Sequence, residues 1–295
     1  MAPPSEPPQS VEDLQAQLRS VGYLAGRGLA TATFLGLRLG RPILLEGEVG
    51  VGKTELAKCL AEIHGRELIR LQCYEGIDTH QALYEWDYAR QMLHVRALSE
   101  RELSDAATLG GLYSEEFLLE RPLLRAIRSG GRAVLLIDEI DRADDEFEAF
   151  LLEILSDFQI TIPEVGSVVA DERPIVILTS NRTRELHDAL KRRCLYHWIG
   201  YPSVEEELEI VRVRAPQAAE ALGSAVVRVV HELRDMDLAK PPGVAETLDW
   251  VEALGVLEQE SLDAATAADT LGSVIKDRDD MELVGDDLDR LLADG

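Results

Sequence analysis

Eight consecutive residues form a pattern that binds phosphate groups in many proteins. Residues 47–54 read Gly-Glu-Val-Gly-Val-Gly-Lys-Thr and match the P-loop pattern G-x-x-x-x-G-K-[ST] in full. Glycines let backbone N–H groups close around phosphate oxygens, and a helix that starts there adds partial positive charge. We expect Lys53 to reach the β- and γ-phosphates and the Thr54 hydroxyl to bind Mg²⁺. The predicted nucleotide-binding residues are Gly47, Glu48, Val49, Gly50, Val51, Gly52, Lys53, Thr54 and Glu55.

A chance glycine-rich turn is the alternative interpretation of this pattern. At an average glycine content of ~7%, the bare pattern arises in roughly one random chain of this length per hundred. An apolar run, Ile43–Leu45, precedes the loop, and helical periodicity follows it from Thr54 to His64. This context of strand, loop and helix favours the phosphate-binding interpretation.

Two carboxylates follow a second apolar run. Residues 134–137 are all apolar, which is typical of a strand buried on both faces of a sheet, and Asp138 and Glu139 come directly after them. Doubly wound sheets bind ligands at the carboxyl ends of their strands. We expect Asp138 to hold Mg²⁺ through water and Glu139 to orient and polarise the attacking water. Many strands end in acidic residues, so this signal is specific only because a complete P-loop precedes it.

Asn181 follows the next apolar run, and we expect it beside the γ-phosphate and the water. The alternative is an ordinary asparagine in a turn at a strand end. Lys191, Arg192 and Arg193 end the helix expected after it. One interpretation is structural, because the helix dipole favours basic residues at this end of a helix. The other is an arginine finger supplied to a neighbouring subunit, which can increase the rate of hydrolysis ~10³–10⁵-fold. We prefer Arg193 to Arg192 as the finger.

Other motifs exclude several kinds of chemistry. The Asn-Lys-x-Asp sequence that reads guanine does not occur, so the order of motifs favours ATP over GTP. The chain contains neither G-x-S-x-G nor H-E-x-x-H, and its six histidines show no metal-ligand spacing. The three cysteines are far apart and form no CxxC pair, which argues against a disulfide framework or a zinc site and fits a reducing cytoplasm.

The charge of the chain bears on its partners. The formal net charge is −25, and the longest basic run is residues 191–193. Nucleic-acid binders usually need a face rich in lysine and arginine, so we expect no nucleic-acid partner. The first ten residues have no apolar core of a signal peptide, and arginines interrupt the apolar stretch Val21–Leu45. We therefore expect a cytoplasmic protein without a membrane span.

Alternating strand and helix patterns predict an α/β fold with a parallel sheet sandwiched by helices. After Tyr201-Pro202 only helical patterns remain, which indicates a small all-α lid domain. We therefore expect a flexible arm over residues 1–10, a nucleotide-binding domain over 11–201 and the lid over 202–295. The predicted elements are strands at 43–45, 68–73, 133–137 and 175–179, helices at 10–20, 54–64, 117–128, 145–157, 217–236, 244–259 and 261–275, a last short helix after the acidic run 277–282, a hairpin of 158–162 with 167–171, and a helix plus an insertion within 75–116.

With these residues in hand, the chain resembles the MoxR family of AAA+ ATPases, a group of P-loop NTPases, over nearly its whole length. The P-loop, Asp138–Arg142, the hairpin within Phe158–Val169 and Thr179–Arg182 support this resemblance. Residues 188–198 and 240–247 are similar to the CoxD-like branch, which is associated with maturation of molybdenum-copper carbon monoxide dehydrogenase.

The resemblance implies a hexameric ring with ATP bound between subunits. It also implies a partner with a von Willebrand factor A (VWA) domain and a client metalloenzyme. Many AAA+ lids place a second-sensor arginine at the start of a lid helix, but here Pro241–Val244 contains none. Lys240 is a possible substitute for that arginine.

Our main hypothesis is an ATP-driven chaperone of metalloenzyme assembly. A nucleic-acid motor or loader is one alternative, which the acidic charge disfavours. A nucleotide-gated binding module that releases no phosphate is another, and a small-molecule kinase is a weaker one.

Overall fold

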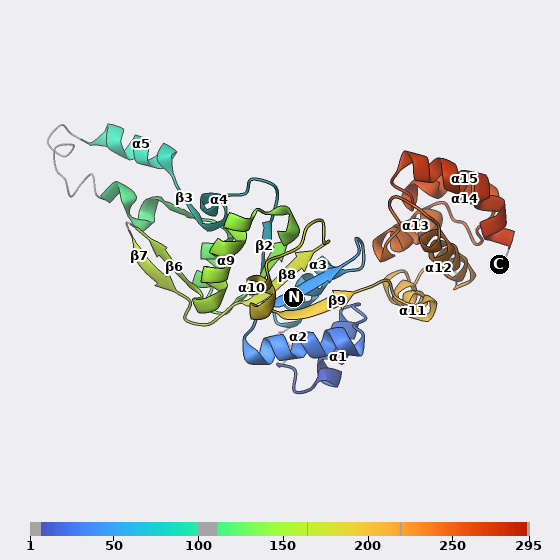
Figure 1. Ribbon diagram of the computed structural model, residues 1–295, viewed down its shortest axis with the longest axis horizontal. Helices are drawn as coiled ribbons and strands as arrows, with labels where there is room; N and C mark the ends of the chain where they lie inside the picture. Colours follow the sequence, from blue (N-terminus) through green and yellow to red (C-terminus); the bar gives the residue numbers. More distant parts are fainter. Residues whose placement is uncertain (1–6, 99–110, 164, 219, 294–295) are drawn as a thin grey trace. The chain divides into compact units, whose positions relative to one another are not determined.

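The computed structural model describes residues 7–98, 111–163, 165–218 and 220–293 (Figure 1). Most of the arm predicted for residues 1–10 lies outside the described residues. By its internal packing the chain divides into two compact units. The first consists of Met1–Gln17, Gly26–Glu46 and Ala57–His197, and the second consists of Leu18–Ala25, Gly47–Leu56 and Trp198–Gly295.

A five-stranded sheet forms the centre of the first unit, and its strand order is β2–β5–β8–β1–β9 (Figure 1). The pairs β2/β5, β5/β8 and β8/β1 are parallel. Every residue of β1 and β5 is buried, because parallel strands of this kind are covered on both faces. The predicted α/β fold with a parallel sheet is confirmed. The strands are β1 (Ile43–Gly47), β2 (Glu67–Gln72), β5 (Ala133–Asp138), β8 (Ile175–Ser180) and β9 (Leu195–Ile199).

Helices flank this sheet, and two of them show why their sequences fold as they do. The N–H of Asp13 donates to Ser10 Oγ at 3.1 Å, so Ser10 caps α1. In α9, Asp144 Oδ1 accepts from the N–H of Phe147 at 2.8 Å, and the apolar face is buried from Phe147 to Leu155. The helices are α1 (Val11–Ser20), α2 (Arg27–Leu39), α3 (Lys53–Ile63), α8 (Pro122–Arg128), α9 (Asp145–Asp157) and α10 (Asp188–Arg193).

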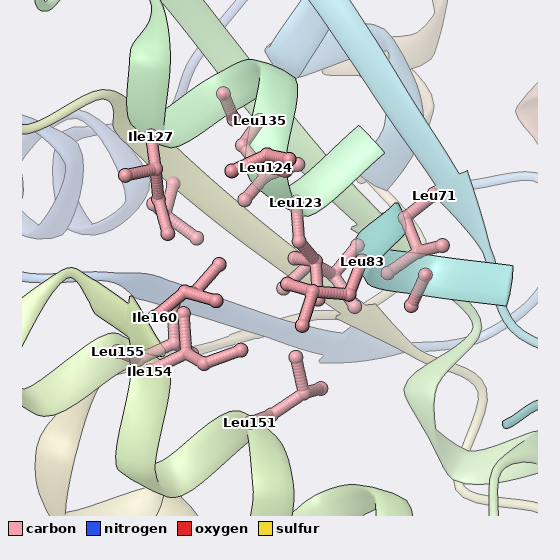
Figure 2. Packing of buried hydrophobic residues seen from close by; sticks show 14 of the residues in the cluster. Leu71, Leu83, Leu123, Leu124, Ile127, Leu135, Leu151, Ile154, Leu155 and Ile160 are labelled. Carbon is pink, nitrogen blue, oxygen red and sulfur yellow. The ribbon is translucent and has the colours of Figure 1, made fainter. Parts of the chain in front are cut away.

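The main core of the first unit lies between the sheet and helices α8 and α9. Figure 2 shows side chains of α8 and α9 converging with Leu71 of β2 and Leu135 of β5. Leu123, Leu124 and Leu151 are completely buried there. This packing holds β2 and β5 in register, so the ends of these strands have fixed positions.

The segment before α8 differs from the prediction. Residues 117–128 were expected to form one helix, but they begin with a 3₁₀ turn and a short strand before α8. Arg121 is extended and Pro122 takes the first helical position, because proline suits that position and disfavours helix in the residue before it. The region 75–116 also holds several short elements, and its residues 99–110 lie outside the described residues. The elements are α4 (Thr79–Leu83), β3 (Tyr84–Trp86), α5 (Tyr88–Ala97), 3₁₀ turns at Gly111–Tyr113 and Glu115–Phe117, and β4 (Leu118–Glu120).

The predicted hairpin is confirmed, with slightly shorter strands than expected. β6 (Gln159–Ile162) pairs antiparallel with β7 (Gly166–Val169). Ile160 and Ile162 are buried whereas Gln159 and Thr161 are exposed, so one face of the hairpin joins the core.

The C-terminal part of the second unit is helical, as predicted, but among the described residues it also contains α11, which was not expected. Ser203 caps α11 through a capping box with Glu206. The helix expected over residues 261–275 is shorter and ends in a 3₁₀ turn. Trp250 lies at the centre of the apolar core of these helices and is completely buried. The helices are α11 (Val204–Arg214), α12 (Glu220–Asp235), α13 (Val244–Val256), α14 (Ala264–Thr270), the 3₁₀ turn Leu271–Ser273 and α15 (Arg278–Ala293).

A search of the described residues finds no helix with the length and apolar character needed to cross a bilayer. The three cysteines are buried and unpaired by disulfides.

Candidate nucleotide site

The P-loop joins the end of β1 to the start of α3, and its glycines are needed for its shape. Gly50 and Gly52 have φ angles of 76° and 90°, in the left-handed region that side chains disfavour. Gly47 lies so close to the backbone carbonyl of Ile199 that a Cβ there would overlap it. The three glycines of the motif therefore meet backbone requirements that other residues would strain.

Lys53 points back into the loop. Its side chain is buried, and its ammonium donates to the carbonyl oxygens of Gly47 at 2.9 Å and Glu48 at 2.5 Å. This geometry closes the loop around one positive charge. Glu55, which we also predicted as nucleotide-binding, accepts a hydrogen bond from Arg214 of α11 at 3.1 Å. Val49 is exposed and Val51 is half-buried, so the loop contributes mainly its backbone.

Asp138 is the last residue of β5 and is held from both neighbouring strands. Its Oδ1 accepts from the Thr179 hydroxyl of β8 at 2.6 Å. Its Oδ2 accepts from Arg70 of β2, at 2.9 Å from Nε and 2.5 Å from Nη2. The carboxylate is buried, and a buried charge is stable only with such partners. An oxygen donor set of this kind suits Mg²⁺ or one of its waters.

Glu139 follows in a left-handed conformation, with φ of 55°. This conformation costs of order 1–3 kcal/mol for a residue with a side chain and is frequent at functional sites. Its N–H donates to Thr179 Oγ1 at 2.9 Å, so one hydroxyl contacts both acids. Its carboxylate accepts from Gln72 and from Arg142, each at 3.0 Å, and is about one-third exposed. Glu139 can therefore exchange partners with solvent, while Asp138 cannot.

Asn181 follows β8 in a segment that is tied down on both sides. Before it, Thr179 binds Asp138. After it, the N–H and the hydroxyl of Thr183 both donate to Asp141 Oδ2 at 2.8 Å. Among the residues that the structure describes, the half-buried amide of Asn181 makes no hydrogen bond of its own. The anchored residues Thr179 and Thr183 thus fix the position of Asn181, whose side-chain amide remains available for a hydrogen bond.

Arg192 and Arg193 end α10, and both are exposed. Arg193 Nε donates to Ser156 Oγ at 2.6 Å, and the carbonyl oxygens of both residues accept from Arg41. Within the described ranges neither guanidinium hydrogen-bonds the acid pair or Asn181. One subunit therefore does not bring these arginines onto its own acids.

Arg70 and Gln72 contact the acid pair, and no sequence pattern pointed to them. Both lie near the end of β2, and the register places Gln72 opposite Asp138. The sequence does show that Arg70 and Gln72 are polar and two residues apart in a strand, and this spacing places both side chains on one face of the sheet. Without the register, nothing connected that face to Asp138.

Cys73 and Lys240 each have their chemistry set by their surroundings. Burial, together with the nearby charge of Asp138, raises the pKa of Cys73 to about 12, so this thiol stays protonated at neutral pH. Lys240 ion-pairs with Asp277 at 3.1 Å, and its backbone N–H donates to Asp280 at 2.9 Å. Its ammonium is therefore directed to the start of α15.

Comparisons with known proteins agree with this arrangement of motifs. The family described as AAA domain (dynein-related subfamily) matches residues 42–194, a little over half of the chain. The gas vesicle ATPase GvpN1 of Halobacterium salinarum is 25% identical over 276 residues, which cover 88% of this chain and 75% of that protein. The chaperone protein ClpB 2 of Synechocystis is 32% identical over 167 residues, which cover 57% of this chain and 16% of that protein.

Among solved structures, the RuvB Holliday junction branch migration motor of Thermotoga maritima is similar with a TM-score of 0.48. The sequences are 17% identical, and the match covers 93% of this chain and 74% of that one.

Proposed function

The chain belongs to the dynein-related subfamily of AAA domains and is an ATPase, and we propose that it is a MoxR-type chaperone that uses ATP hydrolysis to remodel a client protein. The observation that supports this most directly is the shared contact of Asp138 and Glu139 with Thr179, in a chain with a complete P-loop. Such an arrangement fixes one acid and leaves the other free to act on water.

The strand order supports a joint role for the P-loop and the acid pair. The P-loop begins at the carboxyl end of β1, Asp138 ends β5, and β8 is the strand between them in the sheet. Carboxyl ends of parallel strands share one edge, which is where ligands bind in such folds. We infer that residues 47–55 bind the triphosphate of ATP.

We propose that Thr54 and Asp138 hold Mg²⁺. When bound, this ion offsets the negative charge that develops on the phosphates. Lys53 supplies a second positive charge from inside the loop. Arg70 orients the Asp138 carboxylate through its two hydrogen bonds.

Glu139 is the proposed acceptor of the proton of the attacking water. Its carboxylate accepts from Gln72 and Arg142, and both donors bind Oε2. Among the described residues Oε1 makes no hydrogen bond, so during turnover this oxygen is proposed to exchange solvent for the attacking water and to take its proton. Partial exposure of the carboxylate permits this exchange.

Asn181 is proposed to orient the water and the γ-phosphate from the end of β8. Arg193, or Arg192, is proposed to act as the finger in trans on a neighbouring subunit. The exposure of both guanidinium groups and the absence of a hydrogen bond from either to the acid pair, over the residues described, support action across a ring. The proposed assembly is a homo-oligomeric ring, with six subunits as the resemblance implies.

The client and partner follow from resemblance rather than geometry. We propose a metalloenzyme client, of the carbon monoxide dehydrogenase type, and a partner with a VWA domain. The partial similarity to a protein named chaperone ClpB 2 supports remodelling of a protein rather than of a nucleic acid. A net charge of −25 disfavours a nucleic-acid motor for the same reason.

Substitution of Glu139 tests the proposal. In Glu139→Gln the glutamine keeps the size of the side chain and can still contact Gln72 or Arg142, but it cannot accept a proton. The variant should therefore still bind ATP, while its rate of phosphate release should fall by about 10²–10⁴-fold. Glu146→Gln, an exposed neighbour on α9, is the matched control. Normal phosphate release by Glu139→Gln would refute the role given to Glu139. No phosphate release by the unchanged chain, even with its partner, would instead favour a nucleotide-gated binding module.

A further inference from the structure

The second unit contains a backbone contact between the P-loop and the start of α13. The N–H of Ala245 donates to the carbonyl oxygen of Gly50 at 3.1 Å. That N–H is one of the first four of its helix, which have no partner inside the helix. The P-loop therefore supplies a partner that the helix needs.

Gly243, just before α13, makes this approach possible. A Cβ there would lie 2.5 Å from the carbonyl oxygen of Val49 and 2.7 Å from Gly50 Cα. Both neighbours are backbone atoms, which cannot move aside as a flexible side chain can. A residue with a side chain, including a second-sensor arginine, does not fit at position 243 while the contact with the P-loop is made.

A buried ion pair holds the turn that contains Gly243. Glu207 of α11 is completely buried and accepts two hydrogen bonds from Arg234 of α12, at 2.6 and 2.8 Å. Arg234 Nε donates to the carbonyl oxygen of Pro242 at 2.8 Å. The Thr247 hydroxyl of α13 donates to the same Glu207 carboxylate at 2.6 Å. The pair therefore joins three helices to the residue that precedes Gly243.

The same arginine also contacts the segment that leads into α11. The guanidinium of Arg234 stacks 4.5 Å above the ring of Tyr201. His231 adds a further contact to Glu207 at 2.8 Å. Movement of the turn away from these helices would break hydrogen bonds of this network and leave the buried carboxylate of Glu207 short of partners. The turn and the helices are thus expected to move as one body.

We propose that Gly243 and the Glu207–Arg234 pair are positioning residues that couple phosphate binding at the P-loop to α11, α12 and α13. In a trans peptide the carbonyl of Gly50 and the N–H of Val51 point in opposite directions. Because Ala245 holds the carbonyl of Gly50, the orientation of this peptide, and therefore of the N–H of Val51, is fixed. This inference rests on the proposed function, because it assigns the phosphates of ATP to that loop.

The coupling is reciprocal. A contact that preorganises the loop lowers the cost of binding phosphate, and bound phosphate must stabilise the contact by the same free energy. In this chain the contact replaces the second-sensor arginine that Pro241–Val244 lacks. Lys240 does not replace it, since its ammonium pairs with Asp277.

Gly243→Ala tests the proposal, with Gly255→Ala on α13 as the matched control, because a Cβ at Gly255 would meet open space. Fluorescent-nucleotide titration should show about fivefold weaker binding for Gly243→Ala, the equivalent of one hydrogen bond, and no change for the control. Hydrogen exchange with a non-hydrolysable ATP analogue should slow at residues 47–56 and 243–251 in the unchanged chain and the control. In Gly243→Ala it should slow at 47–56 only.

A second variant keeps the test decisive if Gly243→Ala fails to fold. Ala245→Pro removes the donor to Gly50, and proline is tolerated in the first turn of a helix. It should give the same weaker binding and the same loss of protection in α13. Unchanged affinity and retained protection of α13 in a folded variant would overturn the inference. If the unchanged chain binds nucleotide but its hydrogen exchange slows only at residues 47–56, this inference alone is wrong. If the unchanged chain binds no nucleotide, the proposed function fails as well.

Discussion

Asp138 and Glu139 are neighbours in the chain, but their side chains have different surroundings. Asp138 is 3% exposed and is held by Thr179 and Arg70 from two strands. Glu139 is partly exposed, and its partners Gln72 and Arg142 can be replaced by water. A rigid acid suits a metal site, whereas an acid that exchanges partners suits proton transfer. The different roles of the two carboxylates follow from these surroundings.

Thr179 is the residue whose removal should affect both acids together. Thr179→Val keeps the shape but removes the hydroxyl that binds Asp138 and accepts from the N–H of Glu139, so it should destabilise the fold by about 1–3 kcal/mol. The rate of hydrolysis should fall about tenfold or more, while ATP affinity changes little, because the P-loop is untouched. Thr161→Val, at an exposed hairpin position, is the control. Urea unfolding and steady-state ATPase assays measure both effects, and an unaltered rate would contradict the alignment role.

At the residue scale, the sequence indicated the P-loop and the acid pair because their chemistry requires specific residue types at fixed spacings. It did not indicate Arg70 and Gln72. Their contacts with the acids depend on the register of β2 against β5, which pairs Gln72 with Asp138. Register results from packing of the whole sheet, and no local pattern encodes it.

At the scale of elements, α9 and the segment before α10 are connected through one buried acid. Glu148 of α9 is completely buried, ion-pairs with Arg184 and accepts from the N–H of His187 at 3.0 Å. Arg184 also donates to the carbonyl oxygen of Ala143 at 2.6 Å. The start of α10, which ends in the two candidate finger arginines, is therefore positioned by this contact.

Glu148→Gln should loosen this connection. The amide keeps the volume but lacks the charge that Arg184 requires, and we expect a loss of about 2 kcal/mol, less than for a fully buried pair because Arg184 is 28% exposed. Glu153→Gln, at an exposed position of the same helix, should leave stability unchanged. Urea unfolding compares the two variants. Equal stability of both would show that the pair does not fix α10.

The sequence predicted elements well where burial imposes a clear pattern. The strands β1, β5 and β8 are apolar runs because both faces of the sheet are covered. β9 was missed, since its residues alternate between half-buried and exposed and include three aromatic rings. The helix expected over 117–128 was wrong at its start because tertiary pairing of β4 with β3 overrode the local helical pattern.

At the scale of the whole molecule, packing groups residues 47–56 with the C-terminal helices in one compact unit. The composition shift near Pro202 gave no sign of this grouping. The grouping depends on a few backbone contacts, such as the hydrogen bond from Ala245 to Gly50, which composition does not reveal. The net charge of −25 is read directly from the sequence, and its excess negative charges repel one another in the folded chain. Mild acid should reduce this repulsion, because it lowers the net negative charge. Acid also affects individual buried groups, and for two histidines it acts in the opposite direction.

His64 and His197 lie in the first unit, and burial lowers the pKa of both below the ordinary histidine value of about 6.5. The unfolded chain therefore binds protons at a pH where the folded chain does not. Stability from these groups is fully present above about pH 6.5 and is lost as the pH falls through the lowered folded pKa. His64 should show the larger effect, since its buried Nε2 has no hydrogen-bond partner among the described residues.

His64→Gln tests this linkage, because glutamine keeps a polar group in place but does not titrate. Urea unfolding between pH 7.5 and about pH 5 should show a shallower loss of stability for His64→Gln than for the unchanged chain. His80→Gln, at an exposed position, should preserve the original slope. At pH 7.5 His64 is neutral in both the folded and the unfolded chain, so a stability difference from His64→Gln at that pH reports packing and not proton uptake. Identical slopes for all three proteins would mean that His64 takes up its proton without unfolding, and that burial does not hold it neutral.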